Sequence, residues 1–173
     1  GALWVGSEGA GVFTLRGEKF QQPAVHSVAS TAQVYALCRD RTGAMWAATY
    51  GSGIIKYTDG ACEVYSTPHG FPSRVVRSVI EDREGNLWFG TYDGIVSLSE
   101  TNIRTYTTAI GLANNTVMAI GEGARRDIWF GTYGGGVSQL SNEQLTTLDT
   151  NSGLPHNSIR AILKDKRGQL WLG

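Results

Sequence analysis

One stretch of this sequence decides its fold: Asp82-Arg83-Glu84-Gly85-Asn86-Leu87-Trp88-Phe89-Gly90. It reads as a tight turn, with an aspartate at its start and a glycine near its end, followed by a short apolar strand. Related stretches recur along the chain, and the tryptophan marks each of them. Successive tryptophans are 42, 42, 41 and 42 residues apart, at Trp4, Trp46, Trp88, Trp129 and Trp171. A period of this length is typical either of helical repeats or of four-stranded propeller blades.

The local pattern favours strands. Short runs rich in β-branched residues are bounded by glycine or turn clusters, and no apolar stripe of helical period persists. For one period we expect four strands, from the inside outward, at residues 75–81, 87–91, 95–98 and 103–107. The predicted fold class is therefore all-β, a β-propeller of four blades with about 42 residues and four strands in each.

The expected domain covers residues 1–173. Blade periods start near residues 3, 45, 87 and 128, and residues 170–173 begin a fifth blade. We favour a part of a larger ring, of the seven-bladed type, over a closed four-bladed ring. In a closed ring, the N-terminal strands would complete a blade with the C-terminal first strand. Two chains that join into one ring remain an alternative.

Composition excludes several classes of protein. The chain has 173 residues with 15 basic and 15 acidic side chains, so its formal net charge is zero. Nucleic-acid binders and polybasic membrane-surface modules carry a basic excess, so we expect no nucleic-acid partner and no direct membrane contact in this segment. No apolar run is long enough to span a membrane. The first residues, from Gly1 to Trp4, show neither a signal-peptide pattern nor an initial methionine, so we expect the chain to begin inside a longer or processed protein.

We expect the repeated residues to have structural roles. The five tryptophans are expected to pack between blades, and the turn aspartates to accept backbone N–H groups two residues on. A calcium site at Asp82 and Glu84 is disfavoured because two carboxylates are too few for this cation. One blade departs from the pattern, since residues 122–127 replace its turn motif.

Antiparallel strand order sorts the loops onto two faces. The loop face carries the second-to-third strand loops and the connections between blades, while the turn face carries the Asp/Arg/Lys turns. Tyrosines and asparagines gather on the loop face, and Arg77 and Arg160 share a first-strand position with Tyr35 and Met118. Aromatic rings beside polar donors suit a carbohydrate or another small polar ligand, and the arginines would suit an acidic sugar. The alternative is that each tyrosine packs on its own turn. The candidate ligand-binding residues are Tyr50, Tyr92, Tyr133, Arg74, Arg77, Asn115, Asn157 and Arg160.

No pattern selects catalysis, a metal or a cofactor. The histidines His26, His69 and His156 fall at three different repeat positions, which argues against a metal ring. Residues 134–136 are glycines, but no helix follows them to hold a phosphate. Cys38 and Cys62 belong to the first and fourth strands of one blade, about 14 Å apart at the usual strand spacing. A disulfide requires Cα atoms within about 7 Å, so two free thiols are expected.

The segment Gly153–Gly173 resembles the two-component regulator propeller repeat, with Phe71–Tyr92 and Leu112–Tyr133 as weaker copies. The resemblance implies the periplasmic sensor propeller of a bacterial hybrid histidine kinase or diguanylate cyclase. Such a propeller is the non-enzymatic, extracytoplasmic part of an inner-membrane receptor, expected to dimerise and to bind carbohydrate. Further blades or a second chain would then be its partners. A propeller-type lyase or hydrolase and a protein-interaction scaffold are the alternatives.

Overall fold

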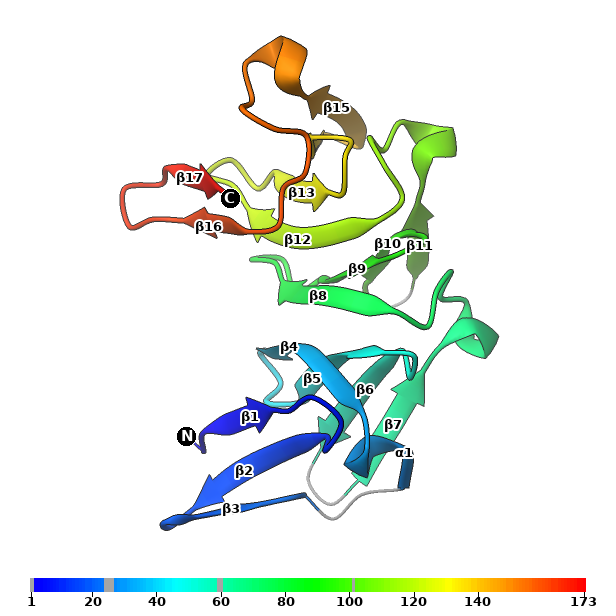
Figure 1. Cartoon of the computed structure of the whole chain (residues 1–173), viewed down its shortest axis with the longest axis vertical. Coiled ribbons are helices and arrows are strands. Elements are labelled where there is room, and N and C mark those ends of the chain that lie inside the picture. The colour runs from blue at the N-terminus through cyan, green and yellow to red at the C-terminus, as the bar shows by residue number, and fades with distance from the viewer. Residues whose placement is uncertain (1, 24–26, 59–60, 101) are drawn as a thin grey trace.

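The computed structural model describes residues 2–23, 27–58, 61–100 and 102–173. In these ranges the chain forms 17 short strands, one short α-helix and three 3-10 turns. Figure 1 shows the strands grouped into sheets that follow one another along the long axis, with the N-terminal sheet at the bottom. None of the helices within these ranges is long and apolar enough to cross a lipid bilayer.

Three sheets are complete blades of four antiparallel strands, and each is named here by its tryptophan. The Trp46 blade contains β4 (Gln33–Arg39), β5 (Met45–Tyr50), β6 (Ile54–Thr58) and β7 (Ala61–Tyr65). The Trp88 blade contains β8 (Val76–Glu81), β9 (Leu87–Thr91), β10 (Gly94–Leu98) and β11 (Ile103–Tyr106). The Trp129 blade contains β12 (Val117–Glu122), β13 (Ile128–Thr132), β14 (Val137–Ser141) and β15 (Gln144–Leu148). The four strands expected for the Trp88 blade are confirmed to within one residue.

Two partial blades flank these sheets. The Trp4 blade has β1 (Trp4–Gly6), β2 (Val12–Arg16) and β3 (Lys19–Gln21), and the Trp171 blade has β16 (Ile162–Lys164) and β17 (Leu170–Leu172). Within the described ranges no strand pairing joins these two end sheets, so the blades form an open array (Figure 1). The connections hold α1 (Ser27–Ser30), η1 (Thr67–His69), η2 (Thr108–Ile110) and η3 (Thr150–Ser152). The all-β propeller fold is thus confirmed as a partial propeller.

The apolar cores lie between neighbouring blades. Successive residues of a strand point to opposite faces, so the tryptophan of one blade meets the phenylalanine of the next. The ring centroids are 5.7 Å apart for Trp46 and Phe89, and 5.7 Å apart for Trp88 and Phe130. Both phenylalanines are completely buried. Each interface therefore joins two sheets that could not bury both faces alone.

The position of a blade in the array sets the exposure of its tryptophan. Trp46 and Trp88 are 3% and 7% exposed, because a blade covers each of them. Trp4 and Trp129 are half-buried, and the Trp4 ring lies 5.8 Å from that of Tyr57. Trp171 departs from the sequence expectation: it is 61% exposed and does not pack between blades here, since no described strand follows it.

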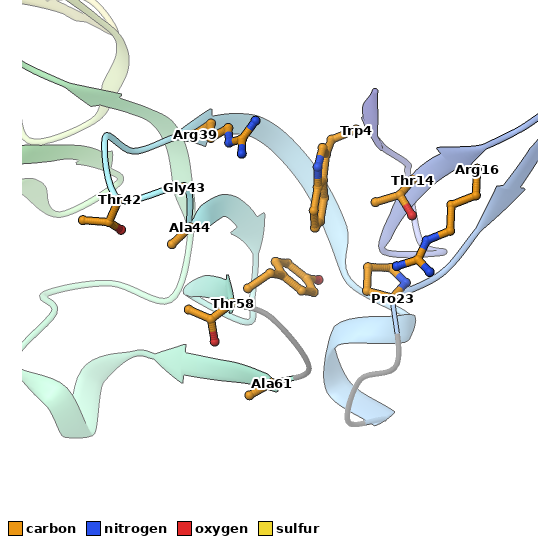
Figure 2. A pocket seen from close by; sticks show the side chains of 11 residues that line it. Trp4, Thr14, Arg16, Pro23, Arg39, Thr42, Gly43, Ala44, Thr58 and Ala61 are labelled. Atoms are coloured by element: carbon orange, nitrogen blue, oxygen red, sulfur yellow. The ribbon is translucent and has the colours of Figure 1, made fainter. Parts of the chain in front are cut away.

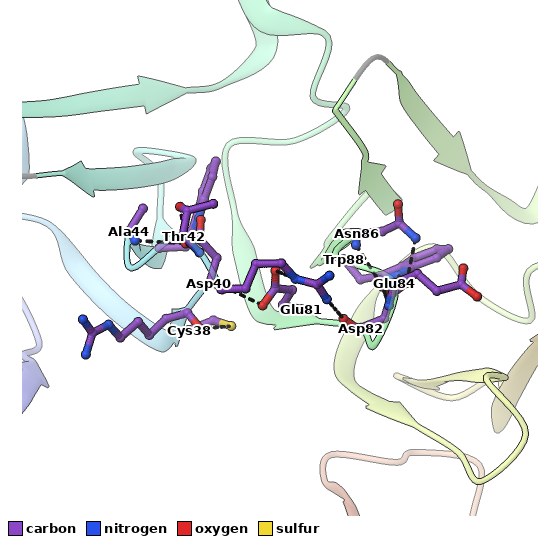
Figure 3. A network of polar contacts seen from close by, with 12 residues as sticks. Cys38, Asp40, Thr42, Ala44, Glu81, Asp82, Glu84, Asn86 and Trp88 are labelled. Carbon is purple, nitrogen blue, oxygen red and sulfur yellow. Dashed lines mark hydrogen bonds and ion pairs between the residues drawn. The ribbon is translucent and has the colours of Figure 1, made fainter. Parts of the chain in front are cut away.

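A shared hydrogen-bond pattern holds each turn to its tryptophan. In the Trp88 blade one oxygen of Asp82 accepts the backbone N–H groups of Glu84 and Asn86 at 2.9 and 2.8 Å. The other oxygen accepts the Trp88 indole N–H at 2.8 Å and the Asn86 amide at 3.0 Å (Figure 3). The glycine three residues after the aspartate has positive φ, 93° at Gly85, as this turn requires. The expected aspartate turn is confirmed, and the indole bond adds to it.

The same pattern recurs in two other blades. Asp40 accepts Thr42 and Ala44 N–H groups and the Trp46 indole at 2.7 Å, and Asp165 accepts the Trp171 indole at 3.2 Å. Burial disfavours the charged form of Asp40. The hydrogen bonds outweigh that cost and hold the pKa of its carboxyl below the usual value.

In the Trp129 blade the carboxylate that accepts the indole N–H comes from the other end of the turn. There Asp127, two residues before the tryptophan, accepts the Trp129 indole N–H and the Arg125 backbone N–H. The oxygen that meets the indole also accepts the Gln139 amide at 2.7 Å. A side chain at Gly123, where the other blades have their aspartate, would collide with the Asp127 carboxylate. Glycine at that position is therefore what makes room for the substitute anchor.

Ion pairs link the turn face of one blade to the next. Arg41 contacts Glu81 at 2.9 Å and also donates to the Asp82 carbonyl at 2.9 Å, and Arg83 lies 3.4 Å from Glu122. Both arginines are half-exposed, and such pairs contribute at most about 1 kcal/mol each. Each pair connects one blade to the next on the turn face. Cys38 and Cys62 are both free thiols, which agrees with their assignment to the first and fourth strands of one blade.

Candidate functional site

The loop face is held together by hydrogen bonds that pass from one blade to the next connection. The N–H groups of Gly53, Gly94 and Gly136 in the second-to-third strand loops donate to backbone carbonyls at 2.9, 2.7 and 2.7 Å. The acceptors belong to the connection that leads into the next blade, at Arg74, Asn115 and Asn157 respectively. Both loop sets therefore lie on one face, as the strand order implies, and the face is a continuous surface.

A β-bulge interrupts the first strand of each complete blade at the same place. In the ladder, Val76 pairs with Thr91 and Ser78 with Gly90, which leaves Arg77 as the extra residue. Register shifts at the equivalent sites leave Tyr35 and Met118 unpaired. In the last partial blade, Arg160 and Ala161 both donate to the Gly173 carbonyl, which is the same two-to-one arrangement. Such bulges redirect a side chain and are over-represented next to functional sites.

The bulges bring three side chains from two blades together. The Arg77 guanidinium lies over the Tyr35 ring, 4.1 Å from its centroid. Tyr50 meets Tyr35 edge-on, with ring centroids 6.1 Å apart and an interplanar angle of 82°. Tyr50 is 51% exposed, so this cluster of Tyr35, Tyr50 and Arg77 faces solvent at the boundary between the Trp46 and Trp88 blades. We call it the bulge cluster.

The other candidate residues are more scattered. Tyr92 and Tyr133 are 37% and 54% exposed, and no ring contact joins either of them to another described aromatic residue. Arg74 and Arg160 are both exposed, and they stand 14 and 11 residues before the tryptophan of their blades. The two remaining candidates have a structural role, described next.

Asn115 and Asn157 fix the connections between blades. The side-chain oxygen of each accepts a backbone N–H at 2.8 Å, from Thr108 and Thr150 respectively, and so closes the 3-10 turn ahead of it. Both residues also accept a glycine N–H through their backbone carbonyls. The side-chain oxygen of each is thus engaged by the loop, so shaping the loop face is their first role.

The histidines of the described chain likewise shape turns. The Nδ1 atom of His69 accepts the Ser66 N–H at 3.2 Å, and that of His156 accepts the Ser158 N–H at 2.9 Å. His26 lies outside the described residues. Within the described ranges no group of three histidine, cysteine or acidic side chains could hold a metal ion.

Sequence reasoning missed Tyr35 as a site residue. Its repeat position is that of Arg77, eleven residues before the tryptophan in each blade, so the register signal was present. What the sequence did not reveal is the bulge. An extra residue changes neither the period nor the alternation enough to be recognised in so short a strand.

Comparison with known proteins supports the repeat assignment. Residues 29–51, 70–93 and 153–173 match the family model described as two component regulator propeller. No curated protein matches the chain.

The fold is similar to several solved propellers. The extracellular domain of a hybrid two component system, BT3049 from B. thetaiotaomicron, is 27% identical with a TM-score of 0.84, over 99% of this chain and 24% of that one. The corresponding domain of BT4673 is 18% identical with a TM-score of 0.81, over 100% and 27% of the two chains. Virginiamycin B lyase from Staphylococcus aureus is 18% identical with a TM-score of 0.74, over 95% and 56%. The chain thus spans about a quarter of the length of these two extracellular domains. Three segments of the chain are thus similar to two component regulator propeller repeats, and the chain as a whole has the fold of a partial propeller.

Proposed function

We propose that this chain is a ligand-sensing propeller of a bacterial signalling receptor of the two-component or cyclic-di-GMP type. The repeat matches support this proposal, as does the similarity to a domain described as extracellular in a hybrid two component system. The segment would lie in the periplasm as part of an inner-membrane protein. It would act by binding, and a kinase or cyclase elsewhere in the receptor would give the output.

The bulge cluster carries the proposal of a ligand site on the loop face. An exposed cation–π contact is worth about 0.5–1 kcal/mol, enough to orient the Arg77 guanidinium without using up its N–H groups. Tyr50 adds an exposed ring beside those donors. A ring face next to charged and neutral donors suits a carbohydrate-like ligand, and an acidic sugar would also engage Arg74 and Arg160.

Further blades or a second chain are the proposed partners at the ends of the array. Leu163 and Trp171 are 66% and 61% exposed on the last partial blade, while the equivalent Trp46 and Trp88 are buried by a neighbour. An adjoining blade would cover this surface in the same way. In the receptor we expect the propeller to be dimeric.

A lyase function has less support. The likeness to virginiamycin B lyase, at 18% identity, concerns the fold. The two described histidines use Nδ1 to accept turn N–H groups, and neither contacts a carboxylate in the described chain. An interaction scaffold would be indicated instead if proteins, and not glycans, bound the loop face.

Binding of neutral and acidic glycans in an array format tests the ligand proposal. We expect Tyr50→Ala and Arg77→Ala each to weaken the selected glycan at least about tenfold. Arg167→Ala, which removes an exposed arginine from the turn face, serves as the control and should leave binding unchanged. If no glycan binds, or if the double variant Arg77→Ala with Arg160→Ala binds as the parent does, the loop-face site is wrong.

A further inference from the structure

The residue that pairs with the tryptophan across the sheet differs from blade to blade. The pairs are Trp4–Thr14, Trp46–Lys56, Trp88–Ser97 and Trp129–Gln139. Paired residues project from the same face of a sheet. Each of these third-strand residues therefore points, with its tryptophan, towards the next blade.

Long side chains stand at two of these positions. The Lys56 ammonium lies 5.1 Å from the centroid of the Trp46 ring. The Gln139 amide donates to the Asp127 carboxylate beside Trp129 at 2.7 Å. Both side chains occupy the space between their blade and the next.

Short hydroxyl residues stand at the other two positions, and each lines a cavity. Thr14 contributes to a cavity of about 440 Å³ with Trp4, Arg16 and Arg39 (Figure 2). Ser97 contributes to one of about 390 Å³ between the Trp88 and Trp129 blades. Both cavities therefore occur where the residue paired with the tryptophan is short. We call the second cavity the Ser97 groove.

The two cavities differ in the hydrogen bonding of the side-chain hydroxyl that lines each of them. The Thr14 hydroxyl donates to the Gln21 carbonyl at 3.3 Å. Ser97 is 7% exposed, and no described residue hydrogen-bonds its hydroxyl. The hydroxyl is not among the fully buried groups that lack a partner, so it is open to the groove and available to a bound molecule. This observation singles out the Ser97 groove.

The charges that line the Ser97 groove are already paired. Arg104 lies 2.9 Å from Glu143, and Arg126 lies 3.1 Å from Glu84. The Asp82 carboxylate accepts four hydrogen bonds from its own turn and Trp88. A charged ligand would have to displace one of these partners, so the lining favours a neutral one.

Neutral groups that both donate and accept hydrogen bonds supply the rest of the lining. Asn102 and Asn142 present side-chain amides that no other described residue engages, and Tyr106 adds a phenol. Amides and hydroxyls match ligand hydroxyl groups, which also donate and accept. A volume of this size lies within the range of small-molecule sites.

We propose that the Ser97 groove is a second binding site, for a neutral, hydroxyl-rich small molecule of the size of a sugar. It lies on the turn face, and it is separate from the loop-face site proposed above. The two sites share no residue, so each can fail without the other.

The chain itself supplies the variant that tests this site. Ser97→Lys copies the blade in which Lys56 covers Trp46, and should close the groove without disturbing the sheet. Thr105→Lys adds the same charge to an exposed position of β11 outside the groove and is the matched control. Binding is measured by saturation-transfer NMR on the whole chain with glucose, galactose, mannose, maltose and cellobiose as probes.

We expect at least one probe to bind the parent and Thr105→Lys equally, and Ser97→Lys to weaken it at least about tenfold. Arg77→Ala should leave this signal unchanged. Ser97→Gln, which copies the blade with Gln139 at this position, replaces the lysine variant if the circular dichroism spectrum of Ser97→Lys changes. The proposal is overturned if no probe binds, if the signal survives closure of the groove, if Thr105→Lys loses it equally, or if glucuronate binds more tightly than glucose.

Discussion

The aspartate that holds each turn to its tryptophan should contribute to stability only where the tryptophan is buried. Asp82→Ala removes the acceptor of four hydrogen bonds. The N–H of Glu84 is on the surface and can bond to water. The Trp88 indole N–H is buried, with Trp88 7% exposed, so its bond is harder to replace. Its lost bond to a carboxylate, and the bonds to Asn86, should together cost about 3 kcal/mol.

Asp165→Ala is the matched control, because it removes the same anchor from the last partial blade. There the indole bond is longer, 3.2 Å, and Trp171 is 61% exposed. Water replaces the carboxylate, so no measurable loss of stability is expected. Asp82→Asn should fall between the two, since one amide oxygen cannot accept from both the turn and the indole.

The assay is urea-induced unfolding of the whole chain, followed by tryptophan fluorescence, with comparison of midpoints at constant m value. The reasoning fails if Asp82→Ala costs less than about 1 kcal/mol. It also fails if Asp165→Ala costs as much as Asp82→Ala, because burial of the indole would then not be the cause.

Three further predictions concern single side chains. Tyr57 has a buried hydroxyl without a hydrogen-bond partner among the described residues, and burial raises its pKa to about 12. Tyr57→Phe should therefore be neutral or stabilise by up to about 1 kcal/mol in the same assay, and a clear loss would reveal a missing partner. The pKa of Asp40 is lowered in the fold, so its carboxylate stabilises the fold above the unfolded-state pKa and loses that effect as pH falls through the folded pKa. The stability difference between the parent and Asp40→Asn should accordingly shrink from about pH 6 to about pH 2, and a constant difference would contradict the linkage. Under native oxidising conditions a thiol assay should find Cys38 and Cys62 both free, with Cys38 the slower to react because burial raises its pKa; a finding of no thiol would contradict the strand assignment.

The sequence predicted the fold well because most of the blades repeat the same contacts. The turn aspartate, its glycine and the tryptophan form one local unit, and their spacing fixes the second strand to the residue. The exposure of Trp171 could not be predicted in this way. Its sequence is that of a buried copy, but its burial depends on a neighbouring blade, which no local pattern reports.

Prediction of the candidate site was less complete for a physical reason. Arg77 and Tyr50 were named from their register, yet the ring that joins them, Tyr35, differs in chemistry from Arg77 at the same position. The asparagines suggested ligand donors, but Asn115 uses its side-chain oxygen to accept a backbone N–H. The sequence alone does not distinguish a side chain that stabilises a loop from one that binds a ligand, because the two differ only in the hydrogen bonds that they make.

The substitution of Asp127 for the usual anchor bears on how such arrays diverge. The family model finds no repeat between residues 94 and 152, the stretch that contains this turn, although the Trp129 blade is complete. The carboxylate reaches the indole from the other end of the turn, so the bond persists while the motif does not. A blade can therefore keep its fold after its motif has diverged, and a count of motifs will then underestimate the number of blades in such an array.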